Sequence, residues 1–456
     1  HRKILVIDGR VGFTGGVNLV DGKNTLFVVE DGGQLTLDGV NITGNSRTKD
    51  EVIRREVRQY ESAWFDSDKV KLSRDRIDRL GYFDSVTADP VPVPGTRDQV
   101  DLEIKVKERP TGSISLGAGY STSEGIILSA GFAQNNVFGT GNSISVDVNT
   151  SKSQRTYALS VVEPYITPEG LSRSYDLYTR RVDLEELDVA DVEYETTGAG
   201  IAWGIPFTET DRVFLGGRIE RTKVMTNANS PQRYQTYRNE FGKDPLSFAL
   251  TLGWSRDSRD NSLAPTRGVY QRVNGEFALP GLDIEYYKFT YQYQQYIPLS
   301  KTWTLAFNTE LGWGDTYGST SMFPFFKNYY AGGIGSVRGF ESGSIGPQDT
   351  NGDNLGGDRK WTGSVELLAP LPGGDRTLRI FGFLDFGSVW GYEGVPGEYG
   401  KYRRADMSLS DLRYSTGIGI AWISPLGPLK FSIAAPLNDK EGDDIQRFQF
   451  QIGTGF

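Results

Sequence analysis

The sequence predicts a mostly β protein, in which an antiparallel transmembrane β-barrel of about 16 strands follows one small α+β domain. Three observations point to the barrel. Apolar and polar residues alternate over many segments, such as 144–149 and 287–293, with the period of a β-strand. Aromatic residues make up 12% of the chain and 56 residues are glycine, which suits aromatic girdles and tight turns. Aromatic side chains gather on the apolar face of these segments, which favours a lipid-facing wall around a wet lumen.

The composition argues against several classes of protein. The net charge is -9 and the chain has no basic block, so nucleic acid is not expected as a partner. Without cysteine there is no disulfide framework, thiolate metal site or cysteine nucleophile. No apolar run approaches the ~18 residues of a transmembrane helix. The barrel region shows no catalytic triad and no P-loop, so we expect no enzyme, no cofactor and no metal there.

Residues 1–33 differ from the rest of the chain. His1, Lys3, Asp8 and Asn18, with Gly15-Gly16, reproduce an H-x-K-x4-D-x6-G-G-x-N pattern. This pattern resembles the active-site signature of the phospholipase D superfamily, which includes cardiolipin synthases. The resemblance implies phosphoryl chemistry at His1, but that chemistry needs two histidines and the chain has one. We therefore interpret 1–33 as a motif fragment and polar junction that is expected to be inactive, with an active phospholipase as the alternative.

Residues 34–110 predict a domain with the order β-α-α-β-β, in which two helices cover a short mixed sheet. Thr48, with Glu51 three residues later, predicts a capping box at the first helix. Ile53, Val57 and Tyr60 follow on one helical face. The remaining elements are expected as strands at 34–42, 85–89 and 99–106, and as a second helix from about Ser67 to the stop at Gly81.

Residues 111–456 predict the barrel. The longest stretch without strand periodicity is 314–357, between the eleventh and twelfth strands. A long glycine-rich segment at this place favours a loop that folds back into the lumen. The expected strands start near residues 113, 126, 142, 154, 173, 190, 211, 245, 268, 284, 302, 358, 378, 413, 428 and 445.

The long segment contains the motif Val337-Arg338-Gly339-Phe340. It resembles the loop-six signature of the BamA family, the outer-membrane protein assembly factors of Gram-negative bacteria. The resemblance implies that Arg338 pairs with lumen-facing acids, which here match Glu366 and Asp385. We interpret this set as a latch that holds the loop, with a switch coupled to substrate insertion as the alternative.

The C-terminus alternates apolar and polar residues and ends on an aromatic residue. Phe448, Phe450, Ile452 and Phe456 resemble the β-signal by which outer-membrane barrels are recognised, and they also fit a closing strand. Gly453 lacks a side chain and weakens strand pairing. It matches the position at which the family's last strand bends inward and opens a lateral seam against the first strand.

Further motifs in 34–110, among them Arg79-Leu80-Gly81-Tyr82-Phe83, resemble the last POTRA domain of the same family. The resemblance implies an insertase with this domain in the periplasm and the barrel in the outer membrane. Its expected partners are unfolded barrel clients, accessory lipoproteins and outer-membrane lipids. The family usually has five such domains, which leaves the docking of the lipoproteins open. A relative that exports a partner protein through its pore, as in two-partner secretion, is the alternative.

Overall fold

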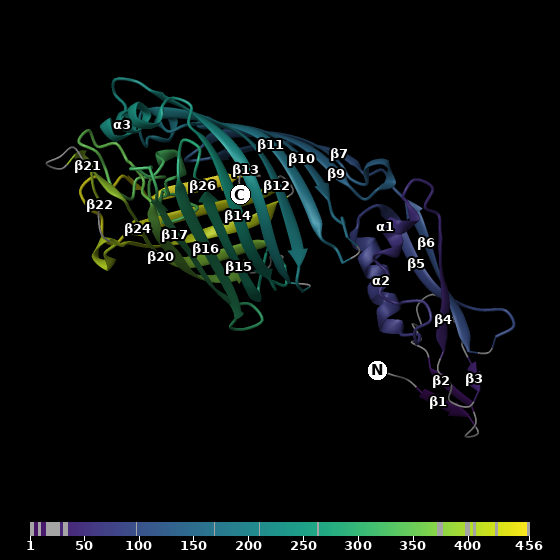
Figure 1. Ribbon diagram of the computed structural model, residues 1–456. Coiled ribbons are helices and arrows are strands. Elements are labelled where there is room, and N and C mark those ends of the chain that lie inside the picture. The colour runs from purple at the N-terminus through teal and green to yellow at the C-terminus, as the bar shows by residue number, and fades with distance from the viewer. Residues whose placement is uncertain are drawn as a thin grey trace. The chain divides into compact units, whose positions relative to one another are not determined.

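A computed structural model describes residues 4–7, 11–14, 28–30, 35–96, 98–167, 169–208, 210–261, 264–371, 377–396, 402–404, 407–424 and 427–453. The chain forms two compact units, residues 1–113 with 133–144 and residues 114–132 with 145–456. Among the described residues, no helix has the length and apolar character needed to cross a membrane. Figure 1 shows the elements of both units.

Three short antiparallel strands begin the first unit, in the order β1 (Ile4–Ile7), β2 (Val11–Thr14) and β3 (Val28–Glu30). A strand therefore occupies part of the stretch that we expected to be a polar junction. His1, Lys3, Asp8 and Asn18 lie outside the described residues, so the interpretation of this motif stays a prediction.

The small α+β domain follows in the predicted order of elements. Its sheet has the order β4-β6-β5, with β6 parallel to β4 and antiparallel to β5. On β6 every second side chain from Val100 to Val106 is buried, so one face of the sheet packs into a core. The elements are β4 (Thr36–Thr43), α1 (Asp50–Arg54), α2 (Ser67–Arg79), β5 (Phe83–Pro92) and β6 (Gln99–Glu108).

The predicted capping box is wrong. The N-cap residue of α1 is Lys49, which makes no side-chain cap hydrogen bond, and the helix has five residues. Thr48 is engaged elsewhere: its N–H donates to Glu108 Oε1 (2.6 Å), and its Oγ1 accepts from Asn136 Nδ2 (2.8 Å). Because these tertiary bonds take up Thr48, they override the local helix-start signal.

The barrel is closed and antiparallel, with 16 strands, as the sequence predicts. The first fifteen begin within two residues of their expected positions. The wall consists of β7 (Gly112–Ser121), β8 (Gly125–Gln134), β9 (Ser143–Thr150), β10 (Gln154–Glu163), β11 (Ser172–Asp183), β12 (Val192–Pro206), β13 (Asp211–Thr226), β14 (Leu246–Asp257), β15 (Gly268–Ala278), β16 (Tyr286–Pro298), β17 (Thr304–Thr316), β19 (Arg359–Pro370), β20 (Leu378–Trp390), β23 (Arg413–Ser424), β24 (Gly427–Pro436) and β26 (Phe448–Ile452).

The last expected strand, from about residue 445, is instead two strands. Ile445–Gln446 form β25, which leaves the wall and pairs with β18 (Gly339–Phe340) in the long loop. The wall resumes at β26 after Arg447. The closing strand is shorter than predicted because its first residues are hydrogen-bonded to the loop.

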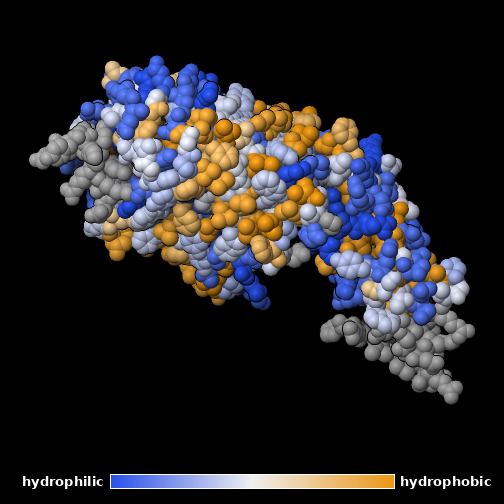
Figure 2. Space-filling model, viewed as in Figure 1, coloured by the Kyte–Doolittle hydropathy of each residue, from blue (hydrophilic) through white to orange (hydrophobic). Residues whose placement is uncertain are grey.

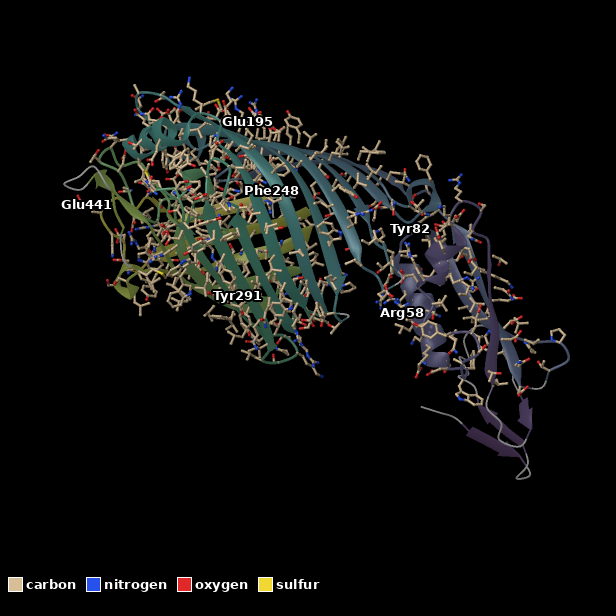
Figure 3. All side chains as sticks on the ribbon, in the orientation of Figure 1. Arg58, Tyr82, Glu195, Phe248, Tyr291 and Glu441 are labelled. Carbon is tan, nitrogen blue, oxygen red and sulfur yellow. The ribbon has the colours of Figure 1, made fainter. Side chains whose placement is uncertain are left out.

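The outer face of the barrel is apolar, as lipid contact requires. Large hydrophobic side chains on every second position of a strand stay exposed, for example Leu250 and Leu252 on β14 and Ile418 and Ile420 on β23. Figure 2 shows hydrophobic residues gathered over the barrel wall, and Figure 3 marks Phe248 of β14 and Tyr291 of β16 on it.

An aromatic core fills the loop-bearing end of the barrel beneath α3 (Gln232–Phe241), which Figure 1 shows at that end. Tyr234 and Phe325 stack with ring centroids 4.2 Å apart, and both are almost fully buried. Through this core, α3 packs against the loop that follows β17. The other short elements are η1 (Val137–Gly139), η2 (Glu185–Leu187), η3 (Phe325–Lys327), β21 (Tyr392–Pro396), β22 (Tyr402–Arg404) and η4 (Leu409–Asp411).

Candidate functional site in the lumen and at the seam

The long loop runs from 317 to 358, between β17 and β19, and glycine allows it to turn back on itself. Gly332 has φ +108°, and a Cβ there would lie 2.0 Å from the carbonyl oxygen of Glu341. Gly339 has φ +92°, and a Cβ there would lie 3.1 Å from the Cβ of Ala434. Only glycine fits both this backbone conformation and this spacing, so the motif is closely packed against its surroundings.

The structure places the Arg338 side chain, which is 2% exposed, against two strands of the wall. Its Nε donates to Asp385 Oδ2 (2.7 Å) and its Nη2 to Asp385 Oδ1 (2.6 Å), while its backbone N–H also donates to Oδ2 (3.0 Å). Two parallel bonds between a guanidinium and a carboxylate fix both distance and orientation. Because of the backbone hydrogen bond, Asp385 holds the main chain of the loop as well as the Arg338 side chain.

Glu366 completes the set that we call the latch: Arg338, Glu366 and Asp385. Arg338 Nη1 lies 2.7 Å from Glu366 Oε1, and the guanidinium carbon lies 3.6 Å from the ring centre of Phe383. Lys430 Nζ lies 3.8 Å from the same Glu366 oxygen. With Lys430 the latch holds two positive and two negative charges, so its charges balance, which makes burial tolerable.

The motif is also bonded to the segment that leads into the closing strand. Gly339 and Phe340 pair with Gln446 and Ile445 as the ribbon β18–β25, and the Glu341 N–H donates to the Asp444 carbonyl (2.8 Å). Val337 and Phe340 are fully buried, in a small cluster with Ala331, Ile345 and Val389. The loop therefore contacts two parts of the wall. Arg338 contacts β19 and β20, and Phe340 contacts β25, the segment that leads into β26.

The seam, which we define as the junction of β26 and β7, is short among the residues that the structure describes. Gln451 lies opposite Ser121 and Ile452 opposite Tyr120, and the Thr122 N–H donates to the Phe450 carbonyl (3.1 Å). By comparison, β12 and β13 pair along 15 residues each, and β24 pairs with β26 along five. The seam is therefore weakly held by main-chain hydrogen bonds.

Gly453 ends the described part of the closing strand. Its φ is +93°, and a Cβ there would lie 2.8 Å from the Ala118 carbonyl oxygen and 2.9 Å from the Cα of Gly119. Its N–H donates to the Pro428 carbonyl, which continues the pairing of β24 with β26 by one residue. Phe448, Phe450 and Ile452 alternate with buried Gln449 as expected, whereas Phe456 lies outside the described residues.

Lys327 is a site residue that sequence reasoning missed. It comes from η3 in the same loop, and its Nζ donates to Glu220 Oε2 of β13 (2.6 Å) and to Glu276 Oε1 of β15 (2.8 Å). Lys288 Nζ of β16 donates to the Lys327 carbonyl (2.6 Å). We call Lys327 with Glu220 and Glu276 the second anchor. Its partners lie 107 and 51 residues away in sequence, so no local pattern relates them.

A cavity of about 630 Å³ lies in the lumen, with Arg338 and Glu366 of the latch among its lining residues. Arg259, Arg379 and Gln292 also line it. Arg379 donates to the carbonyls of Ala264 and Pro265, in the turn between β14 and β15. Over the part of the chain that is described, no three His, Cys, Asp or Glu side chains are grouped so that they could hold a metal ion.

Comparison with known proteins gives two family matches. The Omp85 superfamily domain matches residues 136–456, which include the latch, the second anchor and β26. A POTRA family model, described as surface antigen variable number repeat, matches residues 36–109, which include β4 to β6.

Two relatives carry the family assignment. The outer membrane protein assembly factor BamA of Neisseria meningitidis is 42% identical over 457 residues, which cover 94% of this chain and 57% of that protein. The crystal structure of BamA from Haemophilus ducreyi lacking POTRA domains 1–3 matches with a TM-score of 0.78 and 30% identity, covering 98% of this chain and 89% of that one. The chain spans about half the length of the curated BamA relatives that it matches.

A more distant structure shows the fold alone. CdiB from Acinetobacter baumannii matches with a TM-score of 0.57 and 14% identity, covering 92% of this chain and 74% of that one.

Proposed function

This chain belongs to the Omp85 superfamily and, within it, to the BamA family, and from this premise we propose that it folds and inserts β-barrel proteins into the bacterial outer membrane through its seam. The chain is an outer-membrane barrel protein whose POTRA domain lies in the periplasm. The proposal concerns the mechanism, the clients and the partners.

The short seam is the observation that supports the proposal best. A strand edge in a bilayer leaves backbone N–H and C=O groups unpaired, and each unpaired group costs several kcal/mol in hydrocarbon. Most residues of β7 have no partner on β26 among the described residues, since the register joins only Ser121 and Tyr120 to it. An incoming client strand relieves this deficit by pairing with the open edge.

The free energy for insertion comes from the client itself. A client barrel that closes satisfies all its backbone groups and places its apolar band in lipid, so folding is downhill once the barrier is lowered. The seam lowers that barrier because opening it breaks few hydrogen bonds. The latch and the second anchor hold the loop across the lumen, so the wall keeps its shape while β26 moves.

The proposed partners are unfolded barrel clients and the outer-membrane lipids, together with accessory lipoproteins of an assembly complex. The POTRA domain offers a sheet edge for extended clients, because β4 and β5 are the outer strands of its three-stranded sheet. Main-chain pairing at such an edge is independent of client sequence.

The test is client folding in liposomes with the seam locked by a disulfide. The chain has no cysteine, so Ser121→Cys with Gln451→Cys introduces one defined pair across the seam. We expect the oxidised double variant to lose client folding, scored by heat-modifiable migration, and to regain it on reduction.

A matched control places the same disulfide elsewhere in the wall. Thr179 and Thr197 lie opposite each other on β11 and β12, with hydroxyls 3.2 Å apart. Oxidised Thr179→Cys/Thr197→Cys should fold clients like the parent. A parent chain that folds clients no faster than empty liposomes, or a locked seam that works as well as the control, contradicts the proposal.

A further inference from the structure

Gln449 is the side chain of the closing strand that reaches the loop motif. It is fully buried on the lumen face of β26, and its Nε2 donates to the Phe340 carbonyl (2.7 Å). Phe340 is the last residue of the Val-Arg-Gly-Phe motif, two residues after Arg338 of the latch. One hydrogen bond therefore joins the motif directly to the strand that forms the seam.

The chemistry of this side chain favours a specific role over simple packing. Within the described part of the chain, Gln449 Oε1 is buried and accepts no hydrogen bond. A buried polar atom without a partner costs free energy, so an apolar side chain would fill the space at lower cost. What glutamine adds at this position is a donor, which makes the short hydrogen bond to Phe340 and a longer one to Gln446 Oε1 (3.4 Å) on β25.

A continuous series of side-chain and backbone contacts connects the barrel wall at the latch with the seam. Asp385 and Glu366 hold Arg338, and the backbone of Gly339 and Phe340 pairs with β25 just before β26. Gln449 then fastens β26 itself. Since β7 pairs with only two of the described residues of β26, this inner contact adds to the few interactions that hold β26 in place at the seam.

We propose that Gln449 is a positioning residue that ties the closing strand to the loop motif, so that releasing the latch loosens the seam. The inference rests on the function proposed for the seam and names a residue through which the loop acts on it. Coupling of this kind is reciprocal: what loosens the seam must also loosen the latch.

The test measures the rate of disulfide formation between Ser121→Cys and Gln451→Cys in the full chain in liposomes. Gln449→Met keeps the length of the side chain and removes the donor. We expect cross-linking in a short oxidation pulse to slow on the order of fivefold, as for the loss of one buried hydrogen bond. Gln292→Met on β16, which makes the same change beside the lumen cavity, is the control and should leave the rate unchanged.

A double-mutant cycle separates coupling from local damage. If Gln449 acts through the latch, Arg338→Ala and Gln449→Met together should slow cross-linking little more than the stronger of the two alone. Strictly additive effects, or equal rates for Gln449→Met and Gln292→Met, overturn the proposal. If Gln449→Met only damaged β26 locally, its effect on the cross-linking rate would add to that of Arg338→Ala.

A second variant covers the case in which Gln449→Met does not fold. Asp385→Asn weakens the latch and leaves Gln449 intact, and it should slow cross-linking at the seam as well. An unchanged rate would overturn the coupling. Client folding by the parent chain is scored in the same liposomes: its absence refutes the proposed function, whereas an additive cycle in a chain that folds clients refutes the coupling alone.

Discussion

Tyr120 and Phe450 stack face to face across the seam, with ring centroids 5.2 Å apart and ring planes 11° apart. Phe450 also stacks on Phe431 of β24, with centroids 6.0 Å apart. Three aromatic rings thus bridge β24, β26 and β7 where the main-chain pairing is short. Aromatic side chains therefore stabilise the seam at the place where few main-chain hydrogen bonds do.

We therefore expect Tyr120→Ala to loosen the seam by about 0.5–1.5 kcal/mol, the typical value of an aromatic pair beyond its buried area. The measurement is the rate of disulfide formation between cysteines at positions 121 and 451. Tyr157→Ala on β10 removes another exposed tyrosine from the wall and is the control. Equal rates for the two variants would contradict a role for the stack.

Arg338→Ala should destabilise the barrel by about 3–5 kcal/mol, because it leaves the fully buried Asp385 carboxylate without its partner. Arg338→Lys keeps the positive charge but loses the two parallel hydrogen bonds. We therefore expect its stability to lie between that of the parent and that of Arg338→Ala. The readouts are the heat-modifiability midpoint and proteolysis of the loop. Arg155→Ala, at an exposed position of β10, is the control. Unchanged folding rate and client insertion in Arg338→Ala would refute the latch.

Lys327→Met should release the other side of the loop, since Glu220 and Glu276 would then face each other without the shared cation. With Arg338→Ala in the same chain, we expect the lumen to open and ion conductance in planar bilayers to rise well above that of the parent. Lys301→Met, in an exposed turn, should not change conductance. A large steady conductance in the parent itself would instead favour protein export through the pore.

Glu108 makes the POTRA domain sensitive to acid. Burial raises the pKa of its carboxyl, but hydrogen bonds from Thr48, Ser46 and Arg47 outweigh burial and hold the pKa below its ordinary value. Its contribution to stability is therefore present above the unfolded-state pKa of about 4.3. That contribution is lost as the pH falls through the lower folded-state pKa.

Hydrogen exchange at the Arg47 and Thr48 amides in the full chain measures this effect. Glu108→Gln should weaken protection at neutral pH. The difference from the parent should shrink as the pH falls below the unfolded-state pKa of about 4.3 and vanish only below the lower folded-state pKa. Glu103→Gln, on the same strand, is the control. A difference that persists at low pH would contradict the assignment.

Much of the fold is readable from the sequence because each barrel strand carries its own signal. Alternation such as that of 287–293 depends only on which face meets lipid, so β16 is visible without its neighbours. The split between β25 and β26 was not predictable from alternation, because Ile445 and Gln446 continue the pattern but pair with Gly339 and Phe340 more than 100 residues away.

The site residues were predictable from the sequence only where they belong to a known family motif. The Val-Arg-Gly-Phe motif and its acidic partners follow from family resemblance, and the structure places Arg338 beside Glu366 and Asp385; the functional role of the latch remains a prediction. Neither Lys327 nor Gln449 was identified by a sequence motif. Their roles depend on which strands of a closed barrel face each other across the lumen, and that is a property of the assembled wall.

The short closing strand also affects the membrane. At about 3.4 Å per residue, the 16 residues of β13 extend for about 54 Å and the five of β26 for about 17 Å. The hydrocarbon core of a bilayer is about 30 Å thick. We therefore expect the described part of β26 to offer lipid less apolar wall than β13 does, so that the bilayer thins beside it. We expect the bilayer to be thinnest at the place where we propose that a client strand enters it.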